Sequence, residues 1–244
     1  TRFDDYWRGA PPIQKVVWKI IPDAFTRKQE LITGGAHILR ALEPDSFDEV
    51  NDNEGTRALS VLSSRYVYVV LDVDEAPFDN QKFRQALNYA VNKQEIVDTL
   101  FSGFGAAAVN GATHPFLCEN DGGPAVYQYD LEKAKSLIDE ARAEGAPVDD
   151  VIKLYAPNDR YVLDKETGEA VLGYWKAAGL NVEYYPQSRS VLFPLALRSF
   201  TEYKADIDGP FLIGNGNGLG RAEFPYELWL ENKDGGRGRA FASP

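Results

Sequence analysis

Two hydrophobic periodicities divide the chain into short predicted elements. Six runs are rich in β-branched and aromatic residues and predict strands; they span residues 15–22, 37–42, 61–73, 151–155, 180–185 and 205–213. The run over 61–73 gives the strongest of these signals. Both its even-numbered and its odd-numbered positions between 66 and 71 are apolar or aromatic, so we expect this strand to be covered on both faces.

Segments with apolar residues spaced three and four apart predict helices. They span residues 24–33, 83–91, 93–101, 131–144, 164–178 and 191–200. Asp23, Asp79 and Asp130 stand where a side chain caps the first turn of such a helix. From residue 130 onward helices and strands alternate strictly. That alternation predicts an α/β layer with parallel strand pairs and right-handed crossovers.

Composition narrows the class of protein. The chain has 244 residues, which suits one large domain or two small ones, and 26 Lys and Arg against 37 Asp and Glu give a net charge of −11. This acidic balance argues against a nucleic-acid partner, which requires clustered basic residues. A single cysteine excludes an internal disulfide, and two separated histidines disfavour a metal centre, so no metal site and no cofactor are expected. Neither end carries a clear folding stop, and we expect a fragment of a longer protein.

Sequence signals for catalysis are weak. The glycine-rich run 214–220 fits a dinucleotide fingerprint only loosely, since no convincing helix follows it; it favours a loop at a strand end, where ligands bind in open α/β sheets. No G-x-S-x-G nucleophile motif is present. Cys118, four residues after His114, is better interpreted as an incidental thiol than as a nucleophile. A catalytic carboxylate pair stays open as an alternative, although no spacing selects one.

Aromatic residues and one arginine are the better candidates for ligand contact. Several tyrosines, among them Tyr68 and Tyr161, lie on or beside predicted strands, where each belongs either to the core or to the wall of a pocket. Arg160 lies in a short loop after a predicted strand. There a guanidinium can bind a carboxylate through two parallel hydrogen bonds; a solvated surface arginine is the equal alternative.

Residues 76–97 resemble a known family. The segment reads APFDNQKFRQALNYAVNKQEIV and is similar, at nearly every position, to a motif of the family 5 extracellular solute-binding proteins, the periplasmic dipeptide- and oligopeptide-binding components of ABC importers. Further segments agree in order: the Tyr-Trp pair at 6–7, residues 12–21, 27–38, 129–141 and 175–183. His37 replaces the aspartate that is usual at its position.

The resemblance covers nearly the whole chain and implies a fold. That fold is α/β and periplasmic binding protein-like, of class II, with this chain holding part of lobe I and most of lobe II. Residues 1–70 would form part of the first lobe, a β-α-β piece with a hinge strand, and residues 71–244 the second lobe. Family members are about twice as long as this chain. Ligands would bind between the lobes, which close by a hinge motion.

The resemblance also implies site residues. Arg160, in the loop PNDRY at 157–161, matches the position at which dipeptide binders place an arginine on the carboxylate of the ligand. In the stretch 208–220 the family's tryptophan is missing, and Asn215 or Asn217 replaces the aspartate that anchors the ligand's amine. Because a neutral amide provides no charge for an ammonium, an opine, a modified peptide or a sugar-containing ligand is as well supported as a plain dipeptide. The candidate ligand-binding residues are Arg160, Tyr161, Asn215, Asn217, Phe211 and Tyr68.

Three functions follow from the sequence. The first is a monomeric, non-enzymatic substrate-binding protein of an ABC importer, periplasmic or extracellular, that captures peptides or related small solutes and delivers them to a membrane permease. The second is an α/β hydrolytic enzyme acting through carboxylates, which is disfavoured because no nucleophile–base pair emerges. The third is a ligand-sensing regulatory protein with the same fold.

Overall fold

The computed structural model describes residues 2–108, 127–196 and 207–216. Internal contacts divide the chain into two compact units. The first comprises Thr1–Leu42 with Ser46–Ala58, and the second Glu43–Asp45 with Leu59–Pro244. A search of the described residues finds no helix that is both long and apolar enough to cross a membrane.

The first unit contains two helices, α1 over Ala24–Ile32 and α2 over Phe47–Asp52. The predicted cap of α1 is confirmed, because the Asp23 carboxylate accepts a hydrogen bond from the Thr26 N–H at 2.7 Å. Gly34 follows the helix with a φ of +77°, in the left-handed region where glycine ends helices without strain. Local signals therefore set both ends of this helix.

The two strands predicted for the first unit are wrong. Residues 15–22 and 37–42 form no strand, and Ile20 in the first of them is 92% exposed. A strand exists only where a second strand satisfies its backbone N–H and C=O groups, and no described segment pairs with either run. In the second run, Ala41 also adopts a φ of +62°, which interrupts an extended backbone.

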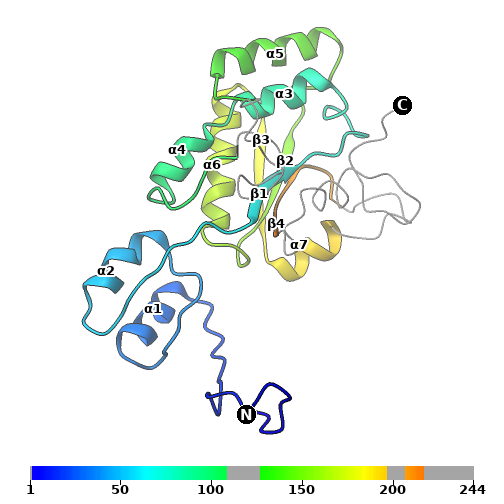
Figure 1. Cartoon of the computed structure of the whole chain (residues 1–244). Coiled ribbons are helices and arrows are strands. Elements are labelled where there is room, and N and C mark those ends of the chain that lie inside the picture. Colours follow the sequence, from blue (N-terminus) through cyan, green and yellow to red (C-terminus); the bar gives the residue numbers. More distant parts are fainter. Residues whose placement is uncertain (1, 109–126, 197–206, 217–244) are drawn as a thin grey trace. The chain divides into compact units, whose positions relative to one another are not determined.

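The second unit is built on a four-stranded sheet with strand order β1-β4-β2-β3 (Figure 1). The strands are β1 over Arg65–Val70, β2 over Ile152–Pro157, β3 over Val182–Gln187 and β4 over Phe211–Gly216. Strand β2 runs parallel to both β3 and β4, which confirms the α/β expectation. Strand β1 is antiparallel to β4 and lies at an edge of the described sheet. Burial rises along β1 toward Val70, and Val67 is 40% exposed. The expectation that both faces are covered is therefore wrong at the start of this edge strand, over which none of the described helices buries the side chains.

Within its described residues, the second unit has five helices beside this sheet. They are α3 over Gln81–Tyr89, α4 over Lys93–Thr99, α5 over Leu131–Ala143, α6 over Asp164–Ala177 and α7 over Arg189–Ala196. Asp130 caps α5 as predicted, accepting from the Lys133 N–H. The cap of α3 is Asn80, which accepts from the Phe83 N–H, and not Asp79. Asparagine and aspartate cap equally well, so the sequence did not discriminate between these neighbours.

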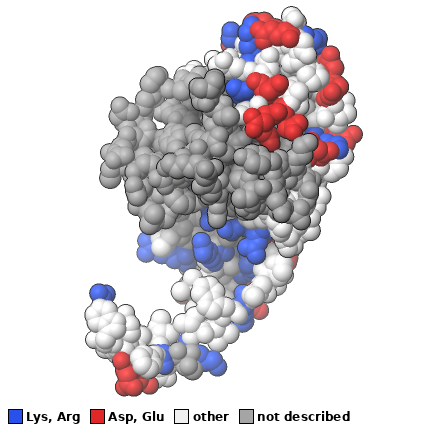
Figure 2. Space-filling view, turned by 90° about the vertical axis from the view of Figure 1, so that its right-hand side faces the viewer, with Lys and Arg blue, Asp and Glu red and all other residues white. Residues whose placement is uncertain are grey.

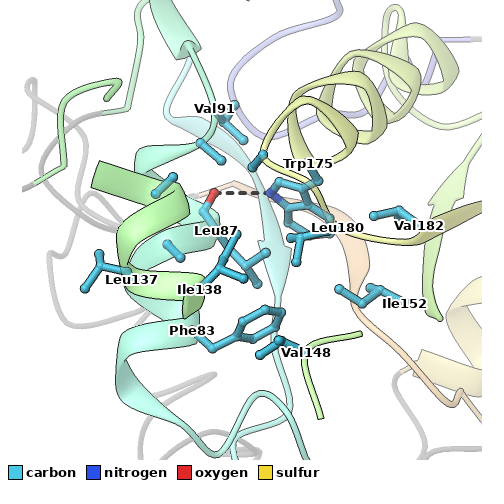
Figure 3. Close-up of a cluster of buried hydrophobic side chains, with 14 of the residues drawn as sticks. Phe83, Leu87, Val91, Leu137, Ile138, Val148, Ile152, Trp175, Leu180 and Val182 are labelled. Atoms are coloured by element: carbon cyan, nitrogen blue, oxygen red, sulfur yellow. Dashed lines mark hydrogen bonds between the residues drawn. The ribbon is translucent and has the colours of Figure 1, made fainter. Parts of the chain in front are cut away.

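The sheet separates two hydrophobic clusters. The larger joins α3, α5 and α6 to one face of the sheet, with Trp175 at its centre (Figure 3). The smaller lies under α7 and consists of Val70, Leu192, Ala196, Phe211 and Ile213. Figure 1 shows α6 and α7 on opposite sides of the sheet. The central parts of β2 and β4 are therefore covered on both faces, which leaves the strand ends and the loops beside them for contact with a ligand.

Candidate functional site

The loop that follows β2 is organised by a single buried carboxylate. Asp164 is 4% exposed and lies at the start of α6. Its Oδ2 accepts hydrogen bonds from the backbone N–H groups of Arg160 at 2.8 Å and Tyr161 at 2.9 Å, and its Oδ1 accepts one from Lys165 at 2.9 Å. Leu163 between them adopts a left-handed φ of +54°. This carboxylate thus holds the loop that carries Arg160 at the carboxyl end of the strand.

Burial raises the pKa of the Asp164 carboxyl above its usual range. Removal from water disfavours the charged form, while the three backbone N–H donors favour it and offset part of the effect. The sequence placed Asp164 at the start of a helix, but nothing in the pattern showed that its side chain turns back to the preceding loop.

Tyr161 connects this loop to strand β4. Its hydroxyl donates a hydrogen bond to the Gly214 carbonyl oxygen at 2.8 Å and accepts one from the Gly214 N–H at 2.7 Å. Strand β2 ends before it reaches Gly214 of β4. The Tyr161 hydroxyl therefore provides the hydrogen bonds to the Gly214 backbone that a longer β2 would otherwise provide. Burial raises the pKa of Tyr161, and the positive charges of Arg160 and Arg65 oppose that rise only in part. The phenol is neutral at physiological pH.

Two guanidinium groups lie over the ring of Tyr161. The Cζ atom of Arg160 is 5.2 Å from the ring centroid, and that of Arg65 is 5.5 Å away, both within the range of cation–π attraction. The Arg160 Nε is buried, and none of the described residues accepts a hydrogen bond from it. Figure 2 shows one group of Lys and Arg side chains near the middle of the view, while Asp and Glu side chains gather toward its upper right.

The structure brings Arg160 and Tyr161 together but separates them from three other predicted site residues. A side chain at Gly214 would point at the Tyr161 ring. Tyr68 and Phe211 belong to the opposite face of the sheet, because β1 and β4 residues alternate, and there they pack in the cluster under α7. Asn215 lies in β4 opposite Tyr66, at a register position shared with Tyr68 and Phe211 and not with Gly214, and Asn217 lies outside the described residues.

A second polar cluster, not predicted from the sequence, crosses the sheet at the start of β4. Asp208 accepts a hydrogen bond from the Tyr155 hydroxyl at 2.7 Å and forms an ion pair with Lys153. The Lys153 hydrogen bond, followed by that of Tyr155, lowers the pKa of Asp208. The rings of Tyr155 and Tyr185 lie 5.2 Å apart on neighbouring strands. The two contacts of Asp208 join residues 55 and 53 positions apart, so no local pattern pointed to them.

The described residues contain no group of three or more His, Cys, Asp or Glu side chains arranged to hold a metal ion. His114 and Cys118, the residues weighed as a nucleophile pair, lie outside the described residues.

Replacing Gly214 by alanine tests the close approach of Tyr161 to β4. The new Cβ would lie 2.8 Å from a ring carbon of Tyr161 and 3.2 Å from the Tyr66 carbonyl oxygen, so the ring must move and its hydrogen bonds to the strand weaken. We expect a loss of about 1–3 kcal/mol in the free energy of unfolding, measured by urea denaturation.

Gly216→Ala is the matched control in the same strand. Its Cβ meets no described atom closer than the Arg65 Nε at 4.0 Å, so unfolding should change little. If the two substitutions lowered the free energy of unfolding equally, the position of the Tyr161 ring would not depend on the absence of a side chain at residue 214.

Comparison with known proteins identifies the class of this fold. A family model described as "Bacterial extracellular solute-binding proteins, family 5 Middle" matches residues 1–235. Heme-binding protein A of Haemophilus influenzae is 31% identical over 185 residues, covering 72% of this chain and 32% of the relative. The dipeptide-binding protein of Escherichia coli is 30% identical over 186 residues, covering 74% and 34% respectively. The chain thus spans about a third of the length of these curated relatives.

Solved structures agree at the level of the fold. A dipeptide-binding protein of Pseudoalteromonas in complex with Met-Leu superposes with a TM-score of 0.76 at 18% identity, over 93% of this chain and 44% of the other. The periplasmic binding protein DppA of Helicobacter pylori in complex with the peptide STSA gives a TM-score of 0.73 at 20% identity, over 86% and 38%. The α/β fold is therefore that of the periplasmic binding proteins. With the family model matching almost all of its length, the chain belongs to the family 5 extracellular solute-binding proteins of bacteria.

Proposed function

We propose that this chain is part of the substrate-binding protein of an ABC importer, which captures peptides or related small solutes and delivers them to a membrane permease. The observation that carries the proposal is Arg160. Its guanidinium lies in a loop at the carboxyl end of a parallel strand, where ligands bind in open α/β sheets, and its buried Nε has no acceptor among the described residues. A ligand carboxylate would supply that acceptor.

The proposed mechanism is capture between two lobes followed by closure. Residues 1–70 would belong to the first lobe and residues 71–244 to the second, with β1 near the crossing between them. The two compact units divide in sequence between Ala58 and Leu59, somewhat before the proposed boundary. We propose a monomer that needs no cofactor and catalyses no reaction; the two curated relatives named above are binding proteins for heme and for dipeptides.

The proposed ligand contacts differ in kind. Arg160 would bind a carboxylate of the ligand, and the Tyr161 ring would hold the Arg160 guanidinium in position through the cation–π contact. Asn215 and Asn217 would provide neutral hydrogen-bonding groups. Tyr68 and Phe211 lie on the opposite face of the sheet from Arg160, so they would act on the ligand only indirectly, by fixing the position of β1 and β4 from within the core. Because neutral amides stand where an anchoring carboxylate would bind an ammonium, we propose opines, modified peptides and sugar-containing solutes as ligands equally with plain dipeptides.

Ligand identification on the full-length protein tests the proposal. Native mass spectrometry would show what co-purifies, and a thermal-shift screen would compare dipeptides, N-acetylated dipeptides, opines and sugars. A ligand at a hundredfold excess over its Kd stabilises the folded state by about 2.7 kcal/mol, which raises the melting temperature by several degrees. The proposal fails if no solute in these classes raises it, or if a probe is chemically converted when it is incubated with the protein.

A further inference from the structure

Arg65 brings a second positive charge to the proposed site. It is the first residue of β1 and pairs with Gly216 of β4, and its Nε lies 4.0 Å from the point where a Gly216 side chain would begin. The absence of a side chain at Gly216 leaves the surface beside this guanidinium open. The guanidinium groups of Arg65 and Arg160 both lie over the ring of Tyr161. The distance between their Cζ atoms is therefore at most the sum of their two distances to the ring centroid, so the two positive charges belong to one site.

Neither of these charges is neutralised within the part of the chain that the structure describes. The ion pairs found there involve other cations. Two carboxylates lie in or beside this loop. Asp164 directs both oxygens to backbone N–H groups, and Asp159 accepts a hydrogen bond from the Arg189 backbone N–H. Tyr161 remains a neutral phenol. The site therefore presents two guanidinium groups of like charge, an arrangement that favours an anionic ligand.

We propose, resting on the proposed function, that the captured ligand is a dicarboxylate: one carboxylate binds Arg160 and a second binds Arg65. A ligand with one carboxylate would leave the other guanidinium without a counter-charge inside a closed site, where water is displaced and Coulomb interactions strengthen. The planar fork of each guanidinium matches the two oxygens of a carboxylate. Within the classes kept above, this favours acidic peptides and opine-like imino diacids over neutral dipeptides and sugars.

Two pairs of probes of equal shape separate the inference from the proposed function. We would titrate the full-length protein calorimetrically, at low ionic strength, with Ala-Glu and Ala-Gln and with their N-acetylated forms. Each pair differs only by one side-chain carboxylate. We expect the Glu member to bind at least tenfold more tightly, and we expect Arg65→Gln to remove this preference chiefly by weakening the binding of the Glu member.

The controls keep the test decisive. Lys176→Gln removes an exposed charge from the last turn of α6, about 20 Å along the helix from the site, and should leave the preference intact. Arg65→Lys keeps the charge without the fork and should retain part of it, which covers the case in which Arg65→Gln does not fold.

Each outcome bears on a different statement. Equal affinities for the Glu and Gln probes in the unaltered protein, or a full preference in Arg65→Gln, would overturn the dicarboxylate inference and leave solute capture standing. No binding of any of the four probes would overturn both.

Discussion

Replacing Trp175 by alanine is expected to lower the free energy of unfolding of the second unit by about 3–5 kcal/mol. The indole is 2% exposed and lies in the cluster that joins α3, α5 and α6 (Figure 3). Its Nε1–H donates a hydrogen bond to the Leu87 carbonyl oxygen at 3.2 Å, in the last turn of α3, where carbonyl groups have no partner within the helix. The substitution therefore leaves both a cavity and an unsatisfied carbonyl.

Urea denaturation followed by far-ultraviolet circular dichroism measures this loss. Trp175→Phe is the matched variant, because it keeps most of the volume but removes the donor; it should cost about 1–3 kcal/mol. The packing argument would be contradicted if the alanine variant were destabilised no more than the phenylalanine variant.

Elements whose signals are local were predicted well. Helix α5 has its cap at Asp130 and its buried face at Ala134, Leu137, Ile138 and Ala141. The sequence located the cap, and the spacing of these apolar residues predicted the helix over 131–144. The parallel pairing of β2 with its neighbours also followed, because the alternation of helices and strands restricts the possible connections.

Elements that depend on distant partners were predicted poorly. Residues 15–22 have the composition of a strand but pair with no described strand, and β4 begins at Phe211, six residues after the start of the predicted run. Strand propensity reflects fit to a pleated surface and not an intrinsic backbone preference. Composition alone therefore does not show where hydrogen-bonding partners lie.

The same distinction explains the candidate site. Arg160 was located because a short loop after a predicted strand is visible in the sequence. The bond between Tyr161 and Gly214 joins residues 53 positions apart, and Arg65 reaches the same ring from another strand. Only the sheet order, with β4 between β1 and β2, brings these residues together, and no periodic pattern encodes that order.

Arg160→Ala is the substitution with the largest expected effect on binding. Truncating one partner of a buried, hydrogen-bonded charge pair costs about 2–5 kcal/mol, so the affinity for a carboxylate-bearing ligand should fall by roughly 30-fold to several thousand-fold. The fold should tolerate the change, because Asp164 holds the loop through the backbone N–H of residue 160 and not through its side chain. Calorimetric titration with the tightest carboxylate ligand from the thermal-shift screen measures the loss.

Arg160→Lys separates charge from geometry in this prediction. A lysine keeps the positive charge but lacks the planar fork that binds both carboxylate oxygens, so it should recover only part of the affinity. Esterification of the ligand carboxylate should weaken binding to the unaltered protein and have little further effect on Arg160→Ala, because the same interaction would already be lost. If Arg160→Ala bound the free acid with unchanged affinity, the guanidinium would not contact the ligand, and the loop after β2 would have only the structural role that Asp164 and Tyr161 give it.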